Sequence, residues 1–352
     1  MATAKIQTVK GLRVEIFSRT LRKNTTRPLI VWIGVTDIER GLPVVHSLGR
    51  PSRSDFVQSE FNEQDLYIDL RRKLMDIKEI IECEFGLIVH DIFVLGQGLD
   101  SIAYLVNDEY VFKQSKNDEA KNNLNKEIQV LNYLKGKITL QIPNIEYYSE
   151  EYGVCGYKEI KGNKLSPIIY KNMSDDEKDK LVQDITLFLR EMHSMPLPNI
   201  DGLELNVIDD YKSDYDILRE IIYHKIPDRS KEWIDDLYKR ILNDERISQY
   251  VKALCHNDLS CNHIIIKNNK AVGIIDFGDV AITDRDKDFI YLLENSSEEI
   301  GREFGLRVLE YYNHPNINIA ILKANLNDEY YPIEQILEGR AKKLDKMYLA
   351  GL

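Results

Sequence analysis

Residues 255–279, CHNDLSCNHIIIKNNKAVGIIDFGD, contain two short apolar runs on either side of a pair of asparagines. The runs IIIK (264–267) and AVGII (271–275) have the composition of β-strands. Asn268 and Asn269 tolerate the positive φ angles of a tight hairpin turn. The segment therefore predicts a β-hairpin, which brings the residues before its first strand close to those after its second.

Asp258 and His263 precede this hairpin, and Asp276 follows it. The hairpin alone therefore predicts that two carboxylates and one imidazole converge. Phosphoryl transfer requires a loop aspartate facing the attacking hydroxyl and ligands for Mg²⁺. We assign Asp258 to the hydroxyl, Asp276 as the main metal ligand and His263 as a further ligand, direct or through water. Mg²⁺ prefers oxygen, so a hydrogen-bonded structural role for His263 is the alternative.

The composition limits the possible partners. The 352 residues carry a net charge of −11, which argues against nucleic acid as a partner and suits a cationic ligand. The longest apolar run, LIVWIGV (29–35), is far shorter than the roughly 20 residues that span a bilayer. The N-terminus has no signal pattern. We therefore expect a cytoplasmic protein without a membrane partner.

The cysteines are few and scattered, at Cys83, Cys155, Cys255 and Cys261. We expect free thiols in a reducing compartment. A zinc site could be imagined at Cys255, His256, Cys261 and His263. That group lacks the close cysteine pair typical of zinc sites, so we do not expect one.

The first 60 residues differ from the rest in charge, with ten Lys and Arg against five Asp and Glu. They contain two predicted strands, RVEIF and LIVWIGV, and a Gly-, Pro- and Ser-rich stretch, 41–60, that is typical of a linker. We expect residues 1–60 to be an N-terminal extension that forms a small β appendage. A basic docking arm is the alternative.

The next segment alternates helix and strand signals. Residues 66–85 have apolar side chains at a helical period and predict an amphipathic helix. A β-meander with a turn at Asn107-Asp108 follows, and then a predicted helix over 121–135. Residues 61–157 therefore predict a small β-rich lobe.

From residue 158 to 352 the helical signal dominates. Ser174 and the acidic residues after it are typical of a helix N-terminus, and the chain is then mostly helical up to residue 250. The sequence as a whole predicts an α+β fold with two lobes, the second helical with the hairpin set into it.

Gly96 and Gly98 lie between two strands of the meander, and Ser101 stands where the kinase pattern G-x-G-x-x-G has its third glycine. Glycines let backbone N–H groups approach phosphate oxygens. Two glycines in a hairpin loop can equally serve only to make the turn, so this signal is weak by itself.

Lys113 ends the third strand of the meander, and Glu127 follows on the helix. The buried stripe of that helix consists of Leu124, Ile128, Leu131 and Leu134. Glu127 falls on the same face, and a carboxylate that points into a core needs a cation. We predict a Lys113–Glu127 pair that holds the nucleotide phosphates. An exposed strand-end lysine is the plain alternative.

The pattern of these residues resembles that of proteins with the protein-kinase-like fold. The sequences of several segments resemble those of the bacterial aminoglycoside 2″-phosphotransferases. The segments are LGQGLDSIAYLVNDEYVFK, IPNIEY, GYKEIKG, CHNDLSCNH, GIIDFGDVAITD, DFIYLLE and EYYPIEQI. A histidine at the metal position, in place of the kinase asparagine, is typical of that subfamily. The resemblance covers about residues 76–340 and excludes the first 60 or so.

The resemblance implies further roles on the nucleotide side. Lys158, Glu159 and Ile160 would form the hinge whose backbone reads the purine, with Tyr157 at the gatekeeper position. A bulky tyrosine would crowd the adenine amino group, so we expect GTP to serve as well as, or instead of, ATP. Ser260 would lie in the catalytic loop and bind phosphate or substrate, or cap the loop.

The resemblance also implies an anionic acceptor site, because aminoglycosides are polycations. Asp279 and Asp284 follow the hairpin, and Glu294 and Glu298 are spaced i,i+4 on a predicted helix face. Tyr331 is a candidate to stack on a sugar ring, with a packed aromatic as the alternative. In this family the acceptors are 4,6-disubstituted aminoglycosides, phosphorylated at the 2″-hydroxyl.

The sequence thus predicts an aminoglycoside phosphotransferase that uses Mg²⁺ with GTP or ATP and confers antibiotic resistance. A kinase-like enzyme acting on a macrolide, choline or homoserine hydroxyl is the first alternative. A non-catalytic nucleotide-binding regulatory protein is the second, and the combination of Lys113, Glu127, Asp258 and Asp276 argues against it.

Overall fold

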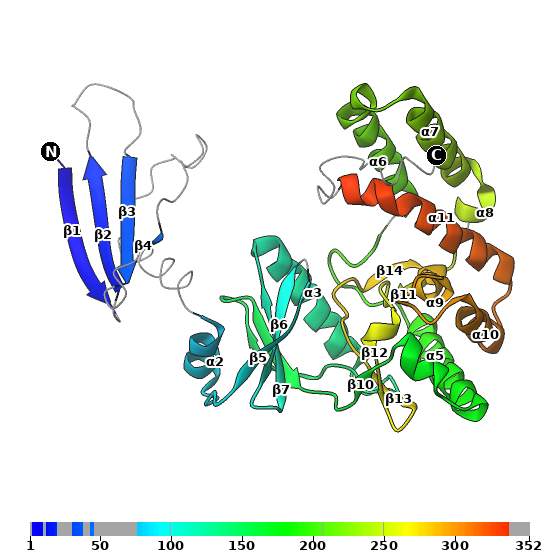
Figure 1. Ribbon diagram of the computed structural model, residues 1–352, viewed down its shortest axis with the longest axis horizontal. Coiled ribbons are helices and arrows are strands. Elements are labelled where there is room, and N and C mark those ends of the chain that lie inside the picture. The colour runs from blue at the N-terminus through cyan, green and yellow to red at the C-terminus, as the bar shows by residue number, and fades with distance from the viewer. Residues whose placement is uncertain are drawn as a thin grey trace. The chain divides into compact units, whose positions relative to one another are not determined.

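The computed structural model describes residues 76–337, apart from 99, 206 and 249, together with the backbone of four N-terminal strands. Within 76–337, the side chains at 207, 208, 209, 210, 248 and 335 lie outside the description. The chain divides into two compact units, Met1–Lys73 and Leu74–Leu352. Figure 1 shows the elements of each unit.

The first unit contains one antiparallel sheet with the strand order β1-β2-β3-β4. Its strands are β1 (Ala2–Val9), β2 (Leu12–Arg19), β3 (Ile30–Asp37) and β4 (Pro43–Val45). The predicted strands RVEIF and LIVWIGV correspond to β2 and β3. The prediction of a linker over 41–60 is wrong in part, because β4 lies within it; the rest of that stretch lies outside the described residues.

The second unit begins with a short helix, α2 (Ile77–Phe85). The Asp76 side chain accepts a hydrogen bond from the backbone N–H of Glu79 at 2.8 Å and so caps the helix. The predicted helix over 66–85 is therefore not one continuous helix. Its residues before Asp76 lie outside the described part of the chain.

A five-stranded sheet forms the first lobe, with the order β5-β6-β7-β9-β8. Its strands are β5 (Ile92–Gln97), β6 (Ser101–Val106), β7 (Tyr110–Ser115), β8 (Ile145–Ser149) and β9 (Val154–Lys158). The predicted turn at Asn107 and Asp108 joins β6 to β7, and both residues have the positive φ angles that this turn requires.

The two faces of this sheet pack against different helices. Phe112 and Val154 belong to a core with α2, whereas Cys155 packs with α3 (Asp118–Leu134). Side chains alternate between faces along a strand, so Lys113, next to Phe112, lies on the α3 face. This alternation directs Lys113 towards Glu127 of α3.

Helices and short strands make up the second lobe (Figure 1). The helices are α4 (Pro167–Lys171), α5 (Asp175–Ser194), α6 (Val207–Ile221), α7 (Asp228–Asn243), α8 (Glu245–Ser248), α9 (Ile290–Leu293), α10 (Arg302–Tyr312) and α11 (Ile317–Leu337). The 3₁₀ turns are η1 (Tyr223–Lys225), η2 (Cys261–His263) and η3 (Arg285–Phe289). As predicted, Ser174 begins α5, where it forms a capping box with Glu177.

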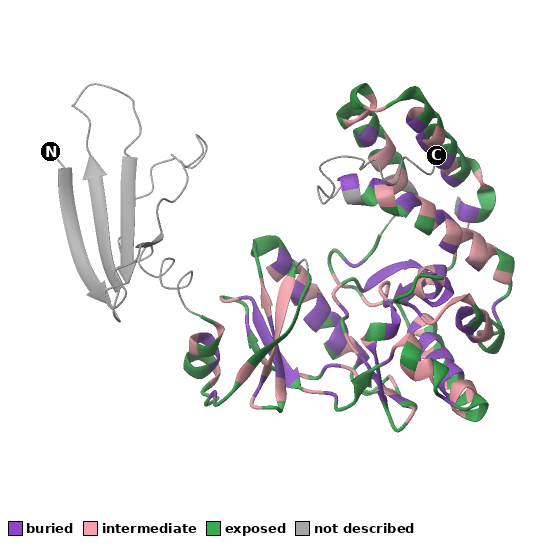
Figure 2. Cartoon of the chain, in the orientation of Figure 1, coloured by how far each residue is buried: buried purple, intermediate pink, exposed green. Residues whose placement is uncertain are grey.

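Two small sheets lie among these helices. One has the order β10-β12-β13 and the other pairs β11 with β14. Their strands are β10 (Asn163–Lys164), β11 (Lys252–Cys255), β12 (Ile264–Lys267), β13 (Lys270–Ile274) and β14 (Ala281–Asp284). Figure 2 shows buried residues along β11, β12, β13 and β14 and exposed residues on the outer side of α5.

The second lobe contains two hydrophobic cores. The larger joins α5, α9 and α10 to the small sheets, and the smaller lies among α6, α7 and α11. Ala320 and Ala324 of α11 belong to the first core, and Tyr330 and Ile333 to the second. Helix α11 therefore ties the two together. Among the described helices, none combines the length and the apolar character that crossing a bilayer demands.

A buried ion cluster connects α11 to the end of β14 and to the turn η3. Lys323 of α11 donates to Asp284 at 2.5 Å and to Asp286 at 2.7 Å, and His314 Nε2 lies 2.8 Å from Asp286 Oδ1. Burial raises the pKa of Asp286, but His314 and Lys323 outweigh it and hold the pKa at about 2. The carboxylate is thus charged and fully paired.

We expect Lys323→Met to lower the free energy of unfolding by about 3–5 kcal/mol, because it leaves Asp284 and Asp286 buried without their cation. The matched control is Arg240→Met, which breaks an exposed ion pair with Glu329 and should cost no more than about 1 kcal/mol. Urea unfolding measures both changes. Equal losses in the two variants would contradict the role given to Lys323.

Candidate active site

The predicted hairpin is present and consists of β12 and β13. Asn268 and Asn269 have φ angles of 51° and 57°, as the tight turn requires. The backbone N–H of Ile275, just beyond β13, donates to the carbonyl of His263, just before β12, at 3.0 Å. This bond closes the open end of the hairpin and brings the two flanking loops together.

Five predicted residues converge at that end. Lys113 Nζ lies 2.9 Å from both carboxylate oxygens of Glu127 and 3.0 Å from Asp276 Oδ1. His263 Nε2 is 3.6 Å from Asp276 Oδ2, and His263 Nδ1 is 3.5 Å from Asp258 Oδ2. The predicted Lys113–Glu127 pair and the convergence of Asp258, His263 and Asp276 are both confirmed as geometry.

The two aspartates have different electrostatic environments. Burial raises the pKa of Asp276, but Lys113 and His263 outweigh it and hold the pKa at about 2. Burial raises the pKa of Asp258 to about 6; His263 opposes the rise, and the charges of Asp279 and Asp276 add to it. Asp276 is therefore a fixed anion, whereas Asp258 has the higher proton affinity.

His263 presents one ring nitrogen to Asp276. Its Nδ1 lies 2.8 Å from the backbone carbonyl of Asp258, to which it donates, so Nε2 is the ring nitrogen that faces Asp276. A metal-ligating histidine is commonly oriented in this way by a second hydrogen bond. Asp276 and Nε2 of His263 thus fit a divalent cation such as Mg²⁺, which keeps further positions for water and phosphate oxygens.

Behind the loop, Asp288 holds the backbone that carries Asp258. The Asp288 carboxylate accepts from the backbone N–H of His256 at 3.0 Å and of Asn257 at 2.6 Å. It also lies 3.0 Å from His193 Nε2, while His193 Nδ1 contacts the Tyr312 hydroxyl at 3.0 Å. Asn257 has a φ angle of 66°, so these bonds fix a loop conformation that a non-glycine residue rarely adopts.

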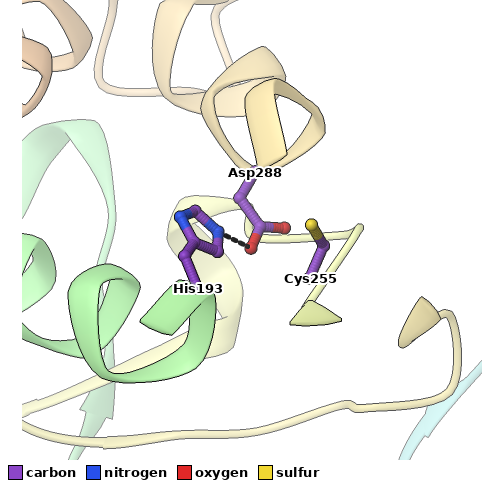
Figure 3. Close-up of side chains that lie close together, drawn as sticks. All are labelled: His193, Cys255 and Asp288. Atoms are coloured by element: carbon purple, nitrogen blue, oxygen red, sulfur yellow. Dashed lines mark hydrogen bonds and ion pairs between the residues drawn. The ribbon is translucent and has the colours of Figure 1, made fainter. Parts of the chain in front are cut away.

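His193, Cys255 and Asp288 lie close enough together to suggest a metal site, with their ligand atoms within 4.8 Å of one another. Figure 3 shows the His193 ring facing the Asp288 carboxylate, with the Cys255 sulfur beside them. The nitrogen and oxygens are already used in hydrogen bonds, and the single S–H of Cys255 is shared between the carbonyls of Ala253 and Asp284, which lie 3.6 and 3.5 Å from the sulfur. Burial raises the pKa of Cys255 well above its usual value, which disfavours the thiolate. This group is a hydrogen-bonded brace for the loop.

The nucleotide-side predictions lie around the first sheet. Gly98 belongs to the turn from β5 to β6, and its backbone N–H donates to the carbonyl of Ser101 at 3.0 Å. The predicted position of Gly96 between the two strands is wrong, because it lies within β5, paired with Ala103 of β6. Tyr157 is buried in β9, opposite Val111. It lies on the same sheet face as Lys113.

Glu159 and Ile160 follow β9 directly. The backbone N–H of Glu159 donates to the carbonyl of Glu109 at 2.9 Å, and the Glu159 side chain accepts from Lys161. Ile160 is buried. Ser260 is also buried, and its Oγ lies 3.3 Å from His263 Nδ1, a contact within the loop.

The acceptor-side predictions need two corrections. Asp284 is buried and paired with Lys323 of α11, so it is not an open acceptor-site carboxylate. Glu294 and Glu298 do not share a helix face, because α9 ends at Leu293 and Glu294 has an extended backbone. Asp279 is exposed, and its charge contributes to the raised pKa of Asp258. Tyr331 lies on α11 with 48% of its surface exposed, so it is not a core aromatic.

Sequence reasoning missed two residues of this region. Glu299 is buried, and its carboxylate accepts from the backbone N–H of Cys261, in the loop that carries Asp258, at 3.0 Å. The Tyr291 hydroxyl donates to Asp258, a bond that lowers the pKa of the carboxyl group against the effect of burial. The sequence contains a feature that could have pointed to Tyr291. This polar aromatic residue lies in the apolar run FIYLL, directly after the acidic segment DRDKD.

Comparisons with known proteins show which family and which solved structures the chain resembles. Residues 91–322 match the sequence profile described as the phosphotransferase enzyme family. The chain is similar to the gentamicin complex of APH(2″)-IIa, with 33% identity over 76% of this chain and 91% of that chain and a TM-score of 0.69.

Two further solved structures are similar. The ADP-bound aminoglycoside phosphotransferase APH(2″)-Ib has 31% identity over 82% of this chain and 95% of its own, with a TM-score of 0.68. The GDP and kanamycin complex of APH(2″)-IIia has 27% identity over 76% of this chain and 92% of its own, with a TM-score of 0.67. The predicted kinase-like, two-lobed fold is therefore confirmed.

A pH-dependent stability follows from His256. Burial lowers the pKa of this histidine to about 4, so between pH 6.5 and pH 4 the unfolded chain binds a proton that the folded chain rejects. Stability should fall with falling pH in this window, more steeply than in His256→Gln by up to about 1.4 kcal/mol per pH unit. Urea unfolding at several pH values measures the slopes.

The exposed His224 provides the control for this measurement. His224→Gln should keep the slope of the unsubstituted protein. If His256→Gln also kept that slope, the buried neutral state of His256 would be refuted.

Proposed function

Because the chain belongs to the phosphotransferase enzyme family, we propose that it moves the γ-phosphate of GTP or ATP to an aminoglycoside hydroxyl, the 2″-hydroxyl in particular. One observation carries this proposal: Glu127, Lys113, Asp276, His263 and Asp258 form an unbroken series of contacts of 3.6 Å or less. In that series Lys113, between Glu127 and Asp276, is the proposed phosphate-binding cation, and Asp258 at the far end is the proposed proton acceptor.

Asp276 and His263 would hold Mg²⁺, which when bound neutralises charge on the triphosphate. Lys113, held by Glu127, would bind the phosphate oxygens as a fixed cation. In this assignment, residues 61–157 contribute the donor side, and residues 158–352 contribute the catalytic loop and the acceptor side.

Asp258 would align the acceptor hydroxyl and accept its proton. Its pKa of about 6 leaves the group mostly ionised near neutral pH, with more proton affinity than an ordinary aspartate. The Asp288 brace fixes the loop before substrate arrives, so that little reorganisation remains for the reaction.

The acceptor is proposed from charge and from the similar structures. Asp258, Asp279, Glu294 and Glu334 all contribute to the electrostatic environment of the Tyr291 hydroxyl, so several carboxylates surround one place beside the catalytic loop. A polycation fits that field, and two of the similar structures contain gentamicin or kanamycin. Phosphorylation would inactivate such an antibiotic and confer resistance.

A phosphorylation assay with kanamycin, gentamicin and a macrolide, each with GTP and with ATP, tests this proposal. We expect transfer to the two aminoglycosides only, with mass spectrometry locating the phosphate on the 2″-oxygen. Asp258→Asn should lower kcat by at least about 100-fold and leave nucleotide affinity nearly unchanged. Transfer to the macrolide alone, or equal loss of turnover and nucleotide affinity in the variant, would contradict it.

The choice of donor is proposed from Tyr157. Its ring is buried at the end of β9, just before the hinge, where it would crowd the amino group of adenine more than the carbonyl of guanine. We expect GTP to give the higher kcat/KM and Tyr157→Met to raise kcat/KM for ATP about ten-fold or more, the effect of about 1.4 kcal/mol. Competition kinetics with both nucleotides measure the ratio. A variant with the unsubstituted preference would remove Tyr157 from the argument.

A further inference from the structure

The catalytic loop ends in a 3₁₀ turn that lacks a cap of its own. This turn, η2, carries His263, and the side chain of its N-cap residue Ser260 caps none of the backbone N–H groups of the turn, contacting the His263 ring instead. A helical turn leaves its first N–H groups without internal partners, and a buried one needs an acceptor from elsewhere. Cys261, the first residue of η2, is buried.

Glu299 supplies that acceptor from a distant part of the chain. Its Oε2 accepts from the backbone N–H of Cys261 at 3.0 Å, and the Cys261 thiol donates to the carbonyl of Glu298 at 3.1 Å. Glu299 is only 7% exposed, whereas the neighbouring Glu298 is exposed. Burying a carboxylate is costly unless it is hydrogen-bonded, so this contact accounts for its inward orientation.

The turn η2 connects the contact of Glu299 to His263 and Asp258. His263 follows Cys261 by two residues in η2 and donates from Nδ1 to the carbonyl of Asp258 at 2.8 Å. Fixing the start of η2 therefore fixes both the ring that faces Asp276 and the backbone of Asp258. The segment 294–300, which contains Glu299, also carries Glu294 of the proposed acceptor site.

We propose that Glu299 is a positioning residue that caps η2 and thereby couples the acceptor-side segment to the metal ligand His263. This inference rests on the proposed function. An acceptor that binds Glu294 would restrain the segment that holds the cap, so acceptor binding and metal-site geometry become linked. Glu299 does this without contact to the reacting atoms.

Binding of Mn²⁺, a paramagnetic probe of the magnesium site, tests the proposal in the full-length protein with GDP present. Loss of the cap in Glu299→Ala should weaken Mn²⁺ binding by about 10- to 100-fold in a titration followed by electron paramagnetic resonance. Glu299→Gln keeps an acceptor oxygen and should bind Mn²⁺ almost as the unsubstituted protein does. The control is Glu303→Ala, an exposed position in the first turn of α10.

Kinetics separate this role from direct acceptor binding. For Glu299→Ala we expect a lower kcat with a nearly unchanged KM for the aminoglycoside. Unchanged Mn²⁺ affinity with a raised acceptor KM would overturn the proposal. If Glu299→Ala does not fold, Glu299→Asp, which shortens the side chain by one methylene, replaces it, and unchanged Mn²⁺ affinity in that variant would have the same meaning. Mn²⁺ binding needs no turnover, so its result stands even if no aminoglycoside is phosphorylated.

Discussion

The ion triple of Lys113, Glu127 and Asp276 is the interaction on which the rest of the site depends. Lys113 and Glu127 belong to the sheet lobe and Asp276 to the helical lobe, with 2.9 and 3.0 Å between the charged atoms. Burial alone would lower the pKa of Lys113, but the two carboxylates raise it well above its usual value. A buried cation that lost these partners would be strongly unfavourable, so the triple fixes how the two lobes meet.

Carboxylates also determine the shape of the catalytic loop. The Asp288 carboxylate accepts hydrogen bonds from the backbone N–H groups of His256 and Asn257 at the start of the loop. The Glu299 carboxylate accepts one from the backbone N–H of Cys261 near the end of the loop. Neither side chain belongs to the loop, and regular secondary structure does not provide these acceptors. The loop is therefore held by charged groups brought from the chain after the hairpin, and its conformation depends on the packing of that region.

The parts of the site that could be predicted from sequence are those fixed by local geometry. Two asparagines specify a turn from their own backbone preferences, and the hairpin then brings Asp258 and Asp276 together without further information. Glu127 is found from the period of one helix, since its neighbours define the buried face.

The parts that could not be predicted depend on contacts between distant segments. The run from 286 to 301 reads as one helix, but the structure has a 3₁₀ turn up to Phe289 and a helix, α9, that ends at Leu293. Asn295 then accepts from the backbone N–H of Arg302, where α10 begins. The hydrogen bond between His193 and Asp288 joins residues 95 positions apart, and no pattern in the sequence near either residue predicts it. Secondary-structure propensity and the spacing of apolar residues describe single helices and strands, whereas these contacts form only when the helices pack together.

The pairing of Lys113 has a consequence for how the donor enters. Its ammonium already has two anionic partners, and Asp279 adds further negative charge to the surroundings. A bare triphosphate would compete with Asp276 for the ammonium while being repelled by every neighbouring carboxylate. A nucleotide that arrives with its charge offset by a divalent ion avoids both costs, because Asp276 then exchanges one cation for another. We therefore expect the resting protein to discriminate against uncomplexed nucleotide, so that ion and donor enter as a single species.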